Sequence, residues 1–565
     1  MRNLTSTSRL ALTATSALTG NARTLLAIGC IAWFVILCFV ATLRLNAFSV
    51  ADEAGYLLPI LYGFDAEKYH RWSILGAYPS YLYFWVYSLL PPAGLPASAK
   101  MLNAGFIAAT AIPAYAVARR YLTIPVAGAF AAVVVLSPIS LFVWYVMPEP
   151  MYFFGFWLVV VVVLSTLDKS PLLSAIAGGA LIGALSLVKP HALALTLGAC
   201  LFFVLRGRFR AHAAFAAVSL FLAYYVVRVV LGFLLTGEWT RSVSAENYGG
   251  ILFGHHVDLL ATAYNAIGHL SAIVTLIAVP LAVTLVLVVC QRAIQTEETD
   301  NLAIQRLRDL GLLACCILAA MVAMTIYFSQ SVYQISPEVE RITRLHGRYY
   351  VYVLPLFVLV TIGLWQVGVE LSQILPRSAV IVLCGAMLVA AAVIVLKFEI
   401  SSIDFPDLTL VRRLPFAAMA LLFVVFVLSY VGWGRIGTNL IIGATIWWAG
   451  IGLATTTALI MRNRTLVLNG PIDAAFFDPA DPSGLRSLVG SSDGIIIGPS
   501  TSAGDVYRTM FYLRSLSAGR LVSSGAAITD DDLPRETRWA VILPGVSYVG
   551  SSHKTYSGAL VIVSK

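Results

Sequence analysis

Charged residues are scarce in this sequence: Asp, Glu, Lys and Arg make up only 12% of its 565 residues, whereas hydrophobic residues make up 59%. A chain of this length could form three or four soluble domains, but so little charge cannot cover their surfaces. Most of the chain must therefore be solvated by lipid, and a soluble enzyme is excluded. Disorder and collagen-like repeats are excluded as well, because aromatic residues reach 11% and the 42 glycines and 24 prolines follow no triplet period.

Cysteine pairs with metal-ligand spacing are also lacking. The seven cysteines show no CxxC spacing and no disulfide framework, and all lie in apolar runs, so they say nothing about the redox compartment. The formal net charge of +9 would suggest a nucleic-acid partner for a soluble protein. Here the basic residues lie mostly in short loops between apolar runs, as membrane topology requires, and we expect no nucleic-acid partner.

Long apolar runs dominate the chain. A helix of about 20 residues crosses the hydrocarbon of a bilayer. Thirteen runs of roughly this length are bounded by charge, at residues 25–43, 100–118, 123–147, 151–167, 172–188, 191–206, 212–235, 268–290, 310–328, 349–369, 379–397, 415–432 and 440–461. The first run is too long and uninterrupted for a cleaved signal peptide, so we expect it to be an anchor. The predicted fold class is an all-α polytopic membrane bundle of about 13 transmembrane helices, spanning residues 25–461.

Basic residues in the short loops predict the orientation of the bundle, because such loops are retained in the cytoplasm. One side carries 14 basic residues against six acids in short loops, and it includes residues 1–24. We therefore expect a multi-pass protein of a bacterial inner membrane with a cytoplasmic N-terminus. The other side, periplasmic or otherwise extracytoplasmic, holds the long loops, where function usually lies. These loops are 44–99, 236–267, 329–348 and 398–414.

Two segments outside the predicted spans have a distinct composition. Residues 78–90 of the first external loop are apolar and aromatic but too short to span, which predicts a helix lying in the membrane interface. Residues 462–565 shift to a polar composition with short apolar runs, which predicts a small extracytoplasmic α/β domain. Its expected strands are Leu466–Leu468, Gly494–Ile497, Trp539–Leu543 and Ala559–Val563, with an amphipathic helix at Ala503–Leu516.

Charged residues from several loops are predicted to lie at the external membrane face. Asp52 and Glu53 follow the first span by about eight residues, and Glu149 lies between two prolines at the end of another. Lys189 lies in a turn between two spans, and Arg348 precedes a further span. Each alone has an ordinary interpretation, such as a hydrated loop or a snorkelling cation. Together, they predict one site for an anionic, lipid-linked substrate.

In this arrangement the sequence resembles the GT-C glycosyltransferases. An Asp-Glu pair follows the first span, an acid closes the second external turn, and Arg348-Tyr349 precedes the helix that contains Leu354-Pro355-Leu356. The resemblance covers residues 25–370 by layout and is nearest to the protein O-mannosyltransferase-like and lipid A aminoarabinose transferase-like branches. It implies an external catalytic face and a polyprenyl-phosphate sugar as donor. The acceptor would be a glycan, a lipid or lipopolysaccharide, and membrane lipids would surround the bundle.

The resemblance also implies roles for individual residues. Asp52 would act as the general base, with inversion at the anomeric carbon. Glu53 would either orient Asp52 or bind a divalent cation (Mg²⁺, Mn²⁺ or Ca²⁺) shared with Glu149, since hard cations prefer several oxygen ligands. The candidates for binding the substrate and its phosphate are Lys189, His346, Arg348, Tyr349 and Tyr56. Tyr56 belongs to an aromatic loop that suits either sugar stacking or a membrane interface.

Two other functions fit the same composition. A secondary transporter or flippase would place ionisable residues at the bilayer midplane, whereas most charges here lie at the ends of the spans; Arg228, within the seventh span, is the exception. An O-antigen ligase or polymerase would use arginine-rich external loops without a base at Asp52, and it would transfer a block of sugars instead of one.

Overall fold

The computed structural model describes the helical part of the chain between residues 24 and 408 and parts of the C-terminal region between residues 494 and 564. The described ranges are residues 24, 27–42, 53, 56–57, 59–60, 79–91, 95–239, 258–290, 301–335, 340–369, 374–401, 403–408, 494–499, 505–506, 509, 518–534, 537–550, 554–556 and 560–564. Asp52, the predicted spans 415–432 and 440–461, and the predicted strand Leu466–Leu468 lie outside them.

Among the described residues, six helices are long and apolar enough to cross a membrane. They are Leu95–Ala118, which comprises α5 (Leu95–Ala109) and α6 (Ala111–Ala118), then α8 (Glu149–Leu167), α11 (Ala211–Thr236), α14 (Leu259–Val289), α15 (Asn301–Ile335) and α18 (Arg377–Lys397). A seventh span is formed if α7 (Ile124–Leu136) and the 3₁₀ helix η1 (Pro138–Trp144), which are bent by 48° relative to each other, count together.

Four of the predicted spans form apolar helices that are shorter than a full crossing. They are Ala27–Thr42, α9 (Pro171–Ser186), α10 (Ala192–Arg206) and Val351–Gln366, the last of which contains η3 (Val351–Val353) and α16 (Leu354–Gln366). The polytopic bundle is thus present, and eleven of the thirteen predicted spans fall on apolar helices of the described chain. Within the described residues, only six or seven of these have the length of a complete crossing. Proline lies at the start of α9 and in the turn between α9 and α10, where it limits their length.

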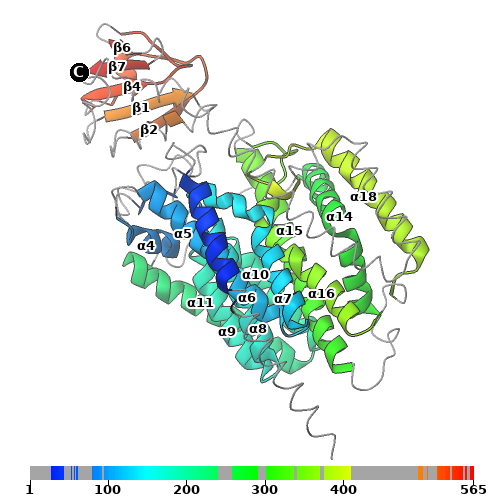
Figure 1. Cartoon of the computed structure of the whole chain (residues 1–565). Helices are drawn as coiled ribbons and strands as arrows, with labels where there is room; N and C mark the ends of the chain where they lie inside the picture. The colour runs from blue at the N-terminus through cyan, green and yellow to red at the C-terminus, as the bar shows by residue number, and fades with distance from the viewer. Residues whose placement is uncertain are drawn as a thin grey trace, which may run out of the picture.

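Close packing of α8, α9, α10 and α11 forms the part of the bundle that carries the candidate site (Figure 1). Glycines on α9 permit this approach: a Cβ atom at Gly179 would lie 2.2 Å from the carbonyl oxygen of Leu220 on α11, and one at Gly183 would lie 2.5 Å from that of Tyr224. Arg228, one turn beyond Tyr224, is buried there and donates to the hydroxyl (3.0 Å) and the carbonyl (3.3 Å) of Ser186. A charge within a membrane helix is usually placed inside the bundle in this way.

The helix expected in the first loop is present as α4 (Tyr81–Ser88), and it ends before Pro91. Its place in the membrane interface stays a prediction. The amide of Leu82 donates to the carbonyl of Leu187, which follows α9, at 2.9 Å. This hydrogen bond joins the first loop to the turn that contains Lys189.

The described C-terminal residues form a five-stranded sheet of order β2-β1-β4-β7-β6, drawn apart from the helices in Figure 1. Strands β1 (Gly494–Pro499), β4 (Trp539–Ile542) and β7 (Leu560–Ser564) confirm three predicted strands, and β2 (Ala518–Val522) and β6 (Lys554–Tyr556) form the edges. β1 is parallel to β2 and β4, whereas β7 is antiparallel to β4 and β6. Strands β3 (Ala527–Ile528) and β5 (Ser547–Tyr548) form a separate parallel pair.

Candidate active site

A buried ion pair lies where α8 begins and α9 ends. The Nζ atom of Lys189 donates to Oε1 of Glu149 at 2.7 Å, and the two side chains are only 5% and 3% exposed. Glu149 is the first residue of α8, where the positive end of the helix dipole favours a carboxylate. Lys189 lies in the short turn between α9 and α10. The structure therefore joins two candidates that the sequence placed in separate loops.

Arg348 adds a second cation to this pair. Its Nη1 atom lies 3.9 Å from Oε1 of Glu149, and its Nη2 donates to the hydroxyl of Tyr349 at 3.3 Å. The ring of Tyr349 has Lys189 Nζ 4.5 Å from its centroid and stacks on His191 at 4.0 Å. Because an aromatic face attracts cations, the ring holds both basic groups at one place.

His191 is the neutral member of this group. Burial, together with the positive charges of Lys189, Arg348 and His346, holds the pKa of its imidazole well below the usual value. A neutral ring stacks on Tyr349 without adding a further positive charge beside the two cations.

His346 lies between two carboxylates that the sequence analysis did not single out. Its Nε2 is 2.7 Å from Oε1 of Glu340, and its Nδ1 is 3.3 Å from Oδ1 of Asp404. Burial opposes the charged imidazole, but the charges and hydrogen bonds of Asp404 and Glu340 outweigh burial and raise its pKa to about 9. His346 is therefore an imidazolium at neutral pH.

Asp404 connects three basic residues of one loop. Arg344 donates to its Oδ2 through Nη2 at 2.7 Å and through Nε at 2.8 Å, and Arg348 Nε lies 3.7 Å from its Oδ1. The backbone carbonyl of Asp404 also accepts the amide of Arg348 at 2.7 Å. Although burial opposes ionisation, the neighbouring His346, Arg348 and Arg344 hold the pKa of the Asp404 carboxyl well below its usual range.

Opposite charge on two loops is the signal that could have identified Asp404; Glu340 belongs to the same loop as His346. The loop before α16 carries Arg341, Arg344, His346 and Arg348, and the loop after α18 carries Glu399, Asp404 and Asp407. The two loops also pair through an isolated bridge between Arg344 and Glu399 and an ion pair of 2.8 Å between Arg341 and Glu399. Both loops were predicted to be external.

Glu53 approaches the same region from the first loop. Its Oε1 accepts the amide of Val146 at 2.9 Å, three residues before Glu149. Tyr83 of α4 interacts electrostatically with both Glu149 and Glu53, and burial first, then these carboxylates and Tyr87, raise the pKa of its hydroxyl well above the usual value. The residue next to Asp52 is thus placed beside the segment that leads into α8.

Tyr56 packs in an aromatic cluster next to Glu53. Its ring contacts Tyr83 edge-to-face at 5.5 Å and Phe84 at 6.3 Å, and Tyr83 packs on Tyr87 at 4.1 Å. Tyr56 is buried, with 7% of its surface exposed, so these contacts attach the start of the first loop to α4. Its predicted role in substrate binding is not evident from these contacts and stays a prediction.

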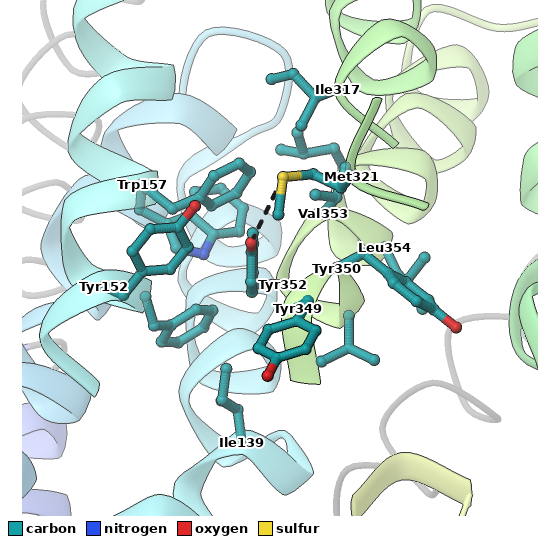
Figure 2. Packing of buried hydrophobic residues seen from close by; sticks show 14 of the residues in the cluster. Ile139, Tyr152, Trp157, Ile317, Met321, Tyr349, Tyr350, Tyr352, Val353 and Leu354 are labelled. Carbon is teal, nitrogen blue, oxygen red and sulfur yellow. Dashed lines mark hydrogen bonds between the residues drawn. The ribbon is translucent and has the colours of Figure 1, made fainter. Parts of the chain in front are cut away.

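Buried side chains pack next to the charged groups. Tyr352 lies between Tyr152 of α8 and Met321 of α15, with its hydroxyl 3.9 Å from the Met321 sulfur (Figure 2). These side chains are buried. Their contacts connect α8 to α15 through the residue three positions after Tyr349.

Within the described part of the chain, no group of three His, Cys, Asp or Glu residues has the arrangement of a metal site. Oε1 of Glu149 is engaged by Lys189, and Oε1 of Glu53 accepts a backbone amide. These contacts involve one oxygen of each carboxylate, and a cation held by Glu149 with Glu53 stays a prediction. A divalent cation that also involves Asp52 stays a prediction from the sequence.

Comparison with known proteins supports the fold. No protein-family model matches the sequence, and no curated protein matches it. Among solved structures, the chain is similar to the crystal structure of ArnT from Cupriavidus metallidurans bound to undecaprenyl phosphate, with a TM-score of 0.51 and 15% sequence identity. The match covers 95% of this chain and 97% of that chain. The chain therefore shares its fold with the ArnT structure. The resemblance drawn from the sequence is confirmed at the level of the fold.

Proposed function

We propose that the chain is an inverting membrane glycosyltransferase that moves one sugar from a polyprenyl-phosphate donor to a hydroxyl of a glycan, lipid or lipopolysaccharide. The observation that carries this proposal is the buried Lys189–Glu149–Arg348 cluster in a GT-C-type fold. The ArnT structure to which this fold is similar was solved with undecaprenyl phosphate. Two buried cations at the ends of membrane helices suit a phosphate that is attached to a lipid.

Lys189 and Arg348 would bind the donor phosphate. Arginine offers a planar set of donors for phosphate oxygens, and lysine adds a compact positive charge. As the bond between the anomeric carbon and the phosphate oxygen breaks, its electron pair moves to the phosphate. The positive groups stabilise this growing charge most strongly because they are shielded from water.

Asp52 would act as the general base. The acceptor oxygen attacks the anomeric carbon on the face opposite the phosphate, and Asp52 takes the proton from that oxygen as the new bond forms. The products are the glycosylated acceptor and polyprenyl phosphate, with the proton held on Asp52. The position of Glu53 beside Val146, near the start of α8, supports this assignment for the neighbouring residue.

The proposed orientation places this site outside the cytoplasm of a bacterial inner membrane, with residues 1–24 on the cytoplasmic side. Residues 462–565 would then form an extracytoplasmic domain that docks the acceptor or shields the site. This orientation follows from the basic residues of the short loops.

The test uses the full-length protein in proteoliposomes with a panel of undecaprenyl-phosphate-linked pentoses and hexoses and an extract of envelope glycolipids. Asp52→Asn is expected to lower transfer by about 10²–10⁴-fold, the usual contribution of a general base, with unchanged thermal unfolding. The control Asp168→Asn, at the opposite end of α8, should retain transfer. Unchanged turnover by Asp52→Asn would remove the base assignment. Movement of the lipid without release of polyprenyl phosphate would favour a flippase, and transfer of sugar blocks would favour a ligase or polymerase.

A further inference from the structure

The carboxylate of Glu149 already contacts Lys189 and Arg348, the two cations that the proposed function assigns to the donor phosphate. Its Oε1 is 2.7 Å from Lys189 Nζ and 3.9 Å from Arg348 Nη1, and the three side chains are at most 9% exposed. Its other oxygen, Oε2, is buried and has no hydrogen-bond partner within the described chain. The carboxylate therefore contacts the cations by one oxygen and leaves the second without a donor.

Ion pairs among the described residues join Lys189, Arg344, His346 and Arg348 to the carboxylates of Glu149, Glu340 and Asp404. A glycosyl phosphodiester donor carries one negative charge, whereas the polyprenyl monophosphate product carries up to two above its second pKa of about 6. Repulsion from Glu149 therefore acts on twice as much charge in the product as in the donor.

We propose that Glu149 is a positioning residue that also competes with phosphate for Lys189 and Arg348, and so promotes release of the monophosphate product. This inference rests on the proposed function. Without lipid, the carboxylate keeps the two buried cations together and compensates for their desolvation. With lipid bound, its charge opposes the phosphate across a short distance and with little screening by water. The competition lowers affinity for the product more than for the donor.

A purely structural role makes the opposite prediction. If Glu149 only holds Lys189 in place, its neutralisation disorders the cations and weakens the binding of both lipids. If it also competes, neutralisation strengthens the binding of both. The change in the logarithm of Kd should then be about twice as large for the monophosphate, because the energy is proportional to the ligand charge.

The experiment measures binding to the full-length protein in nanodiscs at pH 8. The probes are undecaprenyl phosphate and its methyl phosphodiester, which share the lipid but differ in charge. Glu149→Gln is expected to bind the monophosphate about tenfold more tightly and the phosphodiester about threefold more tightly. In the transfer assay, kcat should fall and inhibition by undecaprenyl phosphate should increase, because the product leaves more slowly.

Asp168→Asn is the matched control. Asp168 also lies between two basic residues, Arg120 at 2.7 Å and Arg306 at 3.3 Å, but at the other end of α8. Its neutralisation should leave both lipid affinities unchanged.

Weaker or unchanged binding of both lipids to a folded Glu149→Gln protein would overturn the inference while leaving the proposed function intact. Failure of the wild-type protein to bind either lipid would instead contradict the proposed function. If Glu149→Gln does not fold, Glu149→Asp serves as the second variant. It keeps the charge but withdraws it by one methylene, so smaller increases in both affinities are expected, again with the larger change for the monophosphate. No increase in either affinity would overturn the inference.

Discussion

The two ends of helix α8 present the same chemistry in two environments. At its start, Glu149 binds Lys189 at 2.7 Å, with side chains 3% and 5% exposed. At its end, Asp168 binds Arg120 at the same distance, with side chains 41% and 23% exposed, and Arg306 at 3.3 Å. Distance alone does not distinguish the two pairs. Burial distinguishes them. A buried charge is stabilised mainly by its partner, whereas an exposed charge is also stabilised by water and screened by salt.

This difference suggests separate roles for the two ends. The exposed end connects α6, α8 and α15 through Asp168, and Arg206 of α10 pairs with Asp309 of α15 nearby at 3.0 Å. Such pairs contribute modestly and suit the polar face of a membrane protein. The buried end keeps charges out of water at a cost in stability, which is expected of a site that must bind a charged group.

The largest effect on stability should come from breaking the buried pair. Lys189→Met leaves Glu149 without its nearest cation, and we expect a loss of about 3–5 kcal/mol. Arg120→Met at the other end should cost about 0–1 kcal/mol because Asp168 keeps water and Arg306. Unfolding in detergent followed by intrinsic fluorescence would compare the two. If both variants lost the same free energy of unfolding, burial would not explain the difference between the two ion pairs.

A change in pH should affect the buried end through His346 and Asp404. Because the folded-state pKa of His346 is raised to about 9, its contribution to stability is complete below the unfolded value near 6.5 and is lost as pH rises through about 9. The depressed pKa of Asp404 acts in the other direction: its contribution is present above about 3.8 and is lost as pH falls below that value.

Stability should therefore decline by roughly 3 kcal/mol at most between pH 6.5 and 9.5 through His346. His346→Asn removes this titration, so its stability should vary less with pH over this interval. Thermal unfolding measured at half-unit pH steps would test the difference. Identical pH profiles for wild type and His346→Asn would contradict the assignment of a charged imidazole.

A small, salt-dependent effect is expected for Asp168→Asn. Its partners are partly exposed, so we expect a loss of about 0.5–1 kcal/mol that decreases as salt rises from 0.05 to about 0.5 M. The loss of stability caused by Glu149→Gln should depend little on salt. Unfolding measured at the two salt concentrations would show whether the two ends differ in solvent access as the exposed fractions indicate.

Much of the fold follows from hydropathy. Apolar runs located α8, α11, α14, α15 and α18, and β-branched runs located β1, β4 and β7. Hydropathy did not predict the lengths of the individual helices. Pro138 follows α7, and α9 and α10 are separated by Lys189-Pro190-His191, so the shorter helices depend on local breaks and on packing against their neighbours.

The composition and order of this sequence by themselves determined that the chain is a polytopic helical bundle with charged groups at the ends of its helices. They also determined that Glu149, Lys189 and Arg348 lie in loops or at helix ends. Only the tertiary structure decided that these three side chains meet, and that Glu340 and Asp404 join His346. The physical reason is that hydropathy reports the depth of a residue in the membrane and says nothing about its neighbours at that depth, which are set by helix packing.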